Sequence, residues 1–259
     1  MLIRMLGMEF KRAFWNRLFV ISIVLMVLME LLSSAMVITN TAFGVDEILD
    51  NLFAGTGSDT VLLLLFPLLP YATSYAKDME DHALEFYMVR LDTVPFMLIR
   101  FVTAVFSAFA CVVVSFAVFA LVLLCLGHPL SVGASTGVVA GYQEFLGSHT
   151  ALYLLCYSAD RGLSAVMMAA CAVFMSVLYP HSFFSFTSPA CIYLLSVRLI
   201  FPTEIERAWL TPDSWIEGVY ESASGGFATL LCKVGVAALV CLVYGGLSAA
   251  LAKRRWHYV

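Results

Sequence analysis

The densest group of ionisable side chains in this sequence lies in the segment Lys77–Arg90. The chain is 62% hydrophobic and only 12% charged, so a concentration of charge in one short segment is informative. The ionisable residues of this segment are Lys77, Asp78, Glu80, Asp81, His82, Glu85 and Arg90. We interpret the segment as a surface that the protein presents to a partner.

A helix over residues 77–92 would give this segment two different faces. The residues at helical spacing on its acidic face are Asp78, Asp81, His82 and Glu85. Its apolar face would contain Phe86 and Tyr87, which a purely solvated loop does not need. An amphipathic helix of this kind can lay its apolar face in a groove of a partner while its carboxylates meet cations at the rim. We therefore predict a docking helix here.

Signatures of catalysis are absent from the sequence. It contains no GxxxxGK[ST] phosphate-binding loop, no HExxH or GxSxG motif, and no His/Cys cluster at metal-ligand spacing. We therefore predict no catalytic residue, no metal site and no bound cofactor. The seven cysteines form no CxxC pair and are interpreted as small apolar core residues. A membrane enzyme that uses His128, His149 or Asp160 is a less favoured alternative.

The elements that position the charged segment are apolar helices. The mean hydropathy of +0.94 excludes an ordinary soluble domain, and a bilayer core of about 30 Å needs about 20 apolar residues in a helix. The predicted spans are 18–39, 60–76, 101–126, 162–179, 183–201 and 227–252. Pro67 and Pro70 should kink the second span. The sequence thus predicts a single all-α integral membrane domain with six transmembrane helices.

Residues 1–17 form an amphipathic segment rather than a span. Phe10 and Phe14 lie on its apolar side, Lys11 and Arg12 lie on its polar side, and Trp15 follows at the boundary. This pattern is typical of a helix that lies in the inner membrane interface, with its cations near lipid head groups.

The distribution of charge predicts the orientation. Ten of the fourteen Lys and Arg residues fall on one predicted side of the membrane, which the positive-inside rule makes the cytoplasmic side. They are Arg4, Lys11, Arg12, Arg17, Lys77, Arg90, Arg100, Lys253, Arg254 and Arg255. We expect a multi-pass protein of the cell membrane with both termini in the cytoplasm. Residues 128–161 should then be an external segment with a re-entrant or interfacial helix.

Three charged residues fall inside predicted spans, where they are costly and often functional. Glu30 lies near the middle of the first span, whereas Arg198 and Lys233 lie toward the outer ends of the last two. An ion pair between Glu30 and either cation would lower the cost. We assign the three to a translocation path or a dimer seam, with snorkelling to the outer interface as the alternative for the two cations.

The whole chain resembles the type-2 ABC transporter permeases, the six-helix membrane subunits of ABC exporters. The shared plan is an interfacial N-terminal helix, six spans and a charged helix between spans two and three. Glu80, Leu84 and Glu85 match the family's pattern in that helix, although His82 stands where glycine is usual. Leu210-Thr211-Pro212 resembles the family's external L-x-P element.

This resemblance implies a function and a set of partners. The chain would be the permease of an ATP-driven exporter of a peptide or another amphipathic compound, coupled to a separate ATPase subunit that binds ATP and Mg. The charged segment would be the coupling helix, and a second permease copy or a paralogous permease would complete the pore. The membrane lipid is a further partner, and no nucleic acid is expected. The alternative is a non-transporting membrane immunity or assembly factor.

Overall fold

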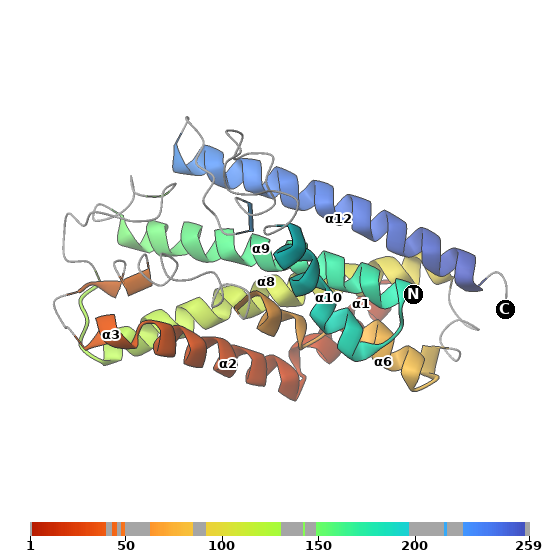
Figure 1. The fold of residues 1–259 in the computed structure, drawn as a ribbon, viewed down its shortest axis with the longest axis horizontal. Coiled ribbons are helices and arrows are strands. Elements are labelled where there is room, and N and C mark those ends of the chain that lie inside the picture. The colour runs from red at the N-terminus through yellow and green to blue at the C-terminus, as the bar shows by residue number, and fades with distance from the viewer. Residues whose placement is uncertain are drawn as a thin grey trace.

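The computed structural model describes residues 2–39, 43–45, 48–49, 63–84, 92–130, 142, 149–196, 215–216 and 225–256. The secondary structure within these ranges is helical, without strands. Figure 1 shows an elongated bundle in which α8 (Thr93–Cys125) and α9 (Thr150–Leu178) run antiparallel, and α12 (Gly226–Trp256) runs beside α9 in the same direction. An all-α membrane architecture is confirmed at this level.

Three helices of the described part are long and apolar enough to cross a membrane: α8, α9 and α12. A fourth candidate is the pair α1 (Leu2–Phe14) and α2 (Arg17–Ser33), which meet at a bend of 47°. The described residues therefore support three spans, or four with the bent pair. Six spans, as the apolar runs predicted, are not supported.

The predicted second span, residues 60–76, does not form one helix over its described part. The 3-10 helix η1 (Phe66–Leu68) and a series of turns separate residues 63–65 from the short helix α6 (Ser74–Glu80). Proline has no N–H for the carbonyl four residues earlier, so Pro70 leaves the Phe66 carbonyl without its helical donor. That carbonyl accepts a 3-10 hydrogen bond of 3.1 Å from the Leu69 N–H and a second hydrogen bond from the Ser22 hydroxyl on α2. The prolines therefore break the helix rather than kink it.

The boundaries of the other predicted spans also change. Helix α9 begins at Thr150, so the end of the predicted external segment 128–161 continues directly into the predicted span 162–179. Residues 18–39 form α2 and the short α3 (Ala35–Ile38). Helix α10 (Ser182–Leu195) has only 14 residues, short of the length that a span needs. By contrast, α8 and α12 contain the predicted spans 101–126 and 227–252 almost completely.

Helices α8 and α9 form the centre of the bundle, and the other helices pack around them. Helices α1 and α2 pack on α8, α10 packs on α9, and α12 packs on both. Gly162 permits the close approach of the central pair, because a Cβ atom there would lie 2.7 Å from the Phe109 ring. Helices α1, α6 and the C-terminal end of α12 lie at one end of the bundle, and α3 lies at the other (Figure 1).

Candidate functional site

Five polar side chains from three parts of the chain meet at the α6 end of the bundle. We call them the charge cluster: Glu9 and Arg12 of α1, Tyr71 of the turn before α6, Asp78 of α6 and Arg100 of α8. The two acids and Arg100 are almost completely buried, with exposed fractions of 7% for Glu9, 4% for Asp78 and 1% for Arg100. Buried charges persist only where they are paired, so these contacts fix the three helices relative to one another.

Asp78 lies between the two arginines of the cluster. The Arg12 guanidinium binds it through two parallel hydrogen bonds, from Nη1 to Oδ2 at 2.8 Å and from Nη2 to Oδ1 at 2.5 Å. Arg100 donates from Nη2 to the same Oδ2 atom. A two-point guanidinium–carboxylate contact sets both distance and orientation. Asp78 therefore links α1 to α8 through α6.

Glu9 is the second acid of the cluster. The Tyr71 hydroxyl donates to its Oε2 atom, and its Oε1 atom lies 3.8 Å from Nε of Arg100. The Arg100 guanidinium also lies over the Phe96 ring, 4.6 Å from the ring centre. Two acids thus face two cations, and the cluster carries no net charge when all four are ionised.

The arginines keep Asp78 ionised despite its burial. Burial by itself raises the pKa of this carboxyl, but the hydrogen bonds from Arg12 and the charge of Arg100 outweigh it and hold the pKa below the ordinary value of 3.8. Asp78 is therefore ionised at neutral pH and forms ion pairs with both arginines.

Glu80, at the end of α6, connects the same segment to α10. Its Oε1 atom accepts a hydrogen bond of 2.9 Å from the backbone N–H of Ser182, the first residue of α10. The first N–H groups of a helix have no partner within the helix, so Glu80 satisfies one of them. This hydrogen bond lowers the pKa of Glu80 below its ordinary value of 4.5. Short as it is, α6 thus contacts α1, α8 and α10.

The predicted docking helix is not continuous across Asp78–Glu85. Helix α6 ends at Glu80, and His82 has a positive φ of 57°, which breaks the helical repeat. Asp81 and His82 are exposed on this turn, whereas Asp78 and Leu84 are buried. The single acidic face is therefore wrong: Asp78 faces the protein, not a partner. Glu85, Phe86, Tyr87 and Arg90 lie outside the described residues.

The predicted interfacial helix does more than lie on lipid. Phe10 packs against Phe14 and against Phe106 of α8, with ring centres 5.7 Å apart in each pair. Lys11 is exposed, and Trp15 is 86% exposed, as a residue at a membrane boundary can be. Arg12, expected near lipid head groups, instead binds Asp78.

Lys233 does not snorkel and does not pair with Glu30. It donates to Asp160 of α9, with 2.7 Å between Nζ and Oδ2, and the two residues are 2% and 3% exposed. The Tyr142 hydroxyl donates to the other oxygen of Asp160 at 3.1 Å. This buried pair joins α9 to α12. Arg198, the other cation that was predicted to pair with Glu30, lies outside the described residues.

Glu30 is completely buried on the face of α2 that packs against the bundle. Neither of its carboxyl oxygens has a hydrogen-bond partner among the described residues. The apolar residues of the opposite face are exposed: Val20, Val24, Leu28 and Leu32. A dimer seam along that exposed face would not include Glu30.

Sequence reasoning missed Glu9 and Asp160 as partners of buried cations, and Tyr71 as the hydrogen-bond donor to Glu9. Their partners lie far along the chain, 62 residues away for the contact between Glu9 and Tyr71 and 73 for that between Asp160 and Lys233. One signal in the sequence could have indicated such a partner: an acid within an apolar stretch. Asp160 is such an acid, in the helix that begins at Thr150. The described residues contain no group of three or more His, Cys, Asp or Glu side chains that could hold a metal ion.

Comparisons with known proteins give no relative for this chain. No family model matches it, and neither the curated proteins nor the solved structures contain a significant match.

Proposed function

We propose that this chain is the membrane-spanning permease of an ATP-driven exporter, of the type-2 ABC kind, and that a separate subunit hydrolyses the ATP. The observation that carries the proposal is the position of α6. It contains the first four residues of the charged segment Lys77–Arg90, which the sequence predicts to be a docking surface, and it is joined by polar contacts to α1, α8 and α10.

These contacts suit a segment that transmits force. If α6 moved while Arg100 stayed in place, the buried ion pair between Asp78 and Arg100 would separate. Loss of one partner of such a pair costs about 3–5 kcal/mol. A displaced α6 therefore pulls on α8, the longest apolar helix described, and through Glu80 it pulls on the start of α10. A movement imposed at the docking surface would reach the membrane helices in this way.

The partners follow from this arrangement. Exposed Asp81 and His82, with the segment that follows them, would contact a cytoplasmic ATPase that binds ATP and Mg. A second copy of the permease or a paralogous one would complete the path, and the exposed stripe of α2 would face lipid or that second subunit. Both termini would lie in the cytoplasm. The exported substrate would be a peptide or another amphipathic compound.

The first experiment is purification of the tagged chain from its native membrane in mild detergent, with identification of the proteins that accompany it by mass spectrometry. We expect an ATPase of the ABC type in comparable amount. A chain that purifies alone would instead favour the non-transporting immunity or assembly factor.

The second experiment tests the docking surface itself. The double variant Glu85→Lys/Phe86→Ala should insert into the membrane normally but lose its stimulation of the partner's ATP hydrolysis. The matched control is Glu206→Lys, a charge reversal on the side predicted to be external, which should leave stimulation unchanged. Normal stimulation in the double variant would contradict docking through this segment.

A further inference from the structure

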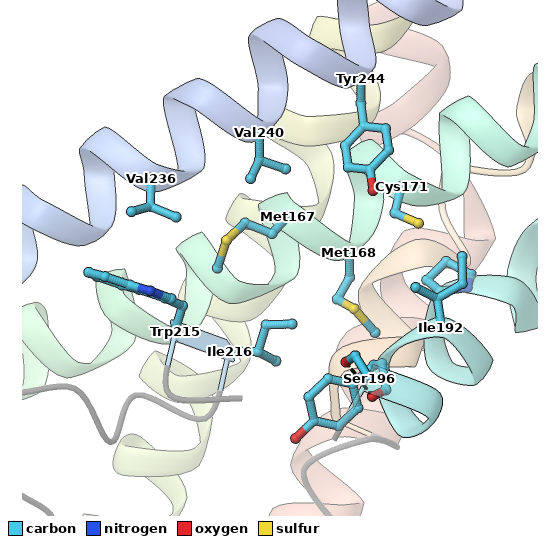
Figure 2. A pocket seen from close by; sticks show the side chains of 12 residues that line it. Met167, Met168, Cys171, Ile192, Ser196, Trp215, Ile216, Val236, Val240 and Tyr244 are labelled. Atoms are coloured by element: carbon cyan, nitrogen blue, oxygen red, sulfur yellow. Dashed lines mark hydrogen bonds between the residues drawn. The ribbon is translucent and has the colours of Figure 1, made fainter. Parts of the chain in front are cut away.

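A cavity of about 340 Å³ lies between α9, α10 and α12, away from the charge cluster. Figure 2 shows Met167, Met168 and Cys171 of α9 at its floor, with Val240 and Tyr244 of α12 and Ile192 of α10 around it. We propose that this cavity binds a neutral aromatic molecule of about two rings, taken up from the lipid phase.

The size of the cavity matches such a molecule. An apolar cavity of about 150 Å³ is enough for one benzene ring, and binding sites for small molecules begin at about 300 Å³. A volume of about 340 Å³ therefore has room for two rings. A large peptide or a folded domain does not fit.

The chemistry of the lining selects against charge and in favour of aromatic rings. The described residues that line the cavity include no Asp, Glu, Lys, Arg or His, so a charged ligand would lose its hydration without a counter-charge. Met167 and Met168 supply two polarisable sulfur atoms, which make favourable contacts with aromatic rings. Trp215 and Tyr244 add aromatic surfaces that stack with a ring.

One wall of the cavity is held in place by a polar contact. Trp215 and Ile216 cover it from the segment between α10 and α12, and the Ser164 hydroxyl of α9 donates to the Ile216 carbonyl at 2.8 Å. On the helices beside the cavity, apolar side chains are exposed, among them Ile192 at 42% and Leu239 at 63%. A ligand dissolved in the bilayer therefore meets an apolar entrance. This binding does not require the proposed ATPase partner, so the two proposals fail independently.

The probe for this site is benzophenone, a neutral two-ring ketone. On irradiation its carbonyl oxygen abstracts a hydrogen atom from a nearby C–H group, with a preference for methionine, and the two carbon radicals then combine to give a hydroxyl-bearing adduct. Mass spectrometry locates the adduct. In the full chain reconstituted in lipid nanodiscs, we expect labelling of Met167 or Met168 that saturates with benzophenone concentration. Labelling of Met36, which is 91% exposed on α3 and lies outside the cavity, should rise linearly, because it reports only non-saturable labelling of an exposed side chain.

Two controls make the result specific. The anionic analogue 4-benzoylbenzoate should label Met167 and Met168 at least ten-fold less than benzophenone. Val240→Trp, which fills the cavity, should remove the saturable labelling, whereas Val243→Trp, at an exposed position of the same helix, should preserve it. Linear labelling at Met167 and Met168, or unchanged labelling in a folded Val240→Trp variant, would show that only lipid enters the cavity and would overturn the proposal.

Discussion

At the scale of single residues, two groups of buried ionisable side chains are paired within the described part of the chain, and Glu30 is buried outside both groups. The charge cluster pairs Glu9 and Asp78 with Arg12 and Arg100 at the α6 end, and Lys233 pairs with Asp160 inside the bundle. Burying a charged side chain is costly unless it meets an oppositely charged partner. Because this chain has few charged residues, each buried one has few possible partners. Such pairs favour one arrangement of helices over alternatives in which a charge meets lipid.

The first prediction concerns Arg100, which contacts both acids of the charge cluster. Arg100→Met should lower the stability of the purified protein by about 3–5 kcal/mol, because the acids remain buried with one cation fewer. Thermal unfolding in detergent measures this. The further change Glu9→Gln should recover part of the loss, and Arg4→Met, at an exposed position of α1, should have little effect. Equal stability of the Arg100 and Arg4 variants would contradict the ion-pair assignment.

The second prediction is a dependence of stability on acid pH that arises from Asp78. Its pKa in the folded protein is below the ordinary value of 3.8, so its contribution is fully present above that value and is lost as the pH falls through the folded pKa. Melting temperatures between about pH 5 and pH 2 should therefore fall more steeply for the natural chain than for Asp78→Asn, which is less stable at pH 7. Parallel curves for the two proteins would show that Asp78 is not held ionised by its arginines.

At the scale of elements, the sequence predicts helices well where a long apolar run has no interruption. This holds for α8 and α12. The start of α9 was misplaced because Asp160 and Arg161 lower the local hydropathy, and only the distant Lys233 makes burial of Asp160 acceptable. The second run was assigned as a span from composition, but its two prolines break the helix.

The candidate site could be predicted only in part, for a related reason. The segment was found from its density of charge, which is a local property. The assignment of its faces required the partners of each acid, and Arg12 lies 66 residues before Asp78 in the chain. Helical periodicity placed Asp78 beside Asp81 and His82, but it contains no information on the turn at His82. The outward face of α6 was therefore predicted incorrectly.

The third prediction tests the packing of α8 on α9 at Gly162. Replacing glycine by alanine inside a helix normally adds up to about 1 kcal/mol of stability. Gly162→Ala should instead destabilise the protein by about 1–3 kcal/mol, because its Cβ atom would lie 2.7 Å from the Phe109 ring. Gly235→Ala on α12 is the control, since nothing lies within 4 Å of its Cβ position. A higher melting temperature for both variants would mean that the two helices are less tightly packed than the structure shows.

At the scale of the whole molecule, the two polar groups and the cavity lie at different places along the same helices. The charge cluster is at the α6 end of α8, whereas the Asp160–Lys233 pair lies near the start of α9 and α12. The cavity lies between α9 and α12, closer to their C-terminal ends than that pair, and α10 forms one of its walls. Because α10 is also bonded to Glu80 at its first residue, a displaced α6 would move one wall of the cavity. Docking and ligand binding would then be coupled through α10.

The last prediction concerns the orientation of the whole molecule and rests on α2. This helix has 17 residues, a length of about 26 Å at 1.5 Å per residue, which nearly matches a bilayer core of about 30 Å. Four cations, Arg4, Lys11, Arg12 and Arg17, lie at or before its N-terminal end, and none lies in residues 18–62. If α2 spans the membrane, the positive-inside rule predicts that Trp15 lies on the cytoplasmic side and Met36 on the outer side. Both positions are exposed, at 86% and 91%.

In a variant without the native cysteines, Met36→Cys should react with an impermeant maleimide added to intact cells, and Trp15→Cys should react only in inverted membrane vesicles. Reaction of both from the same side would show that α2 does not cross the membrane, because a spanning helix cannot expose both of its ends to one compartment.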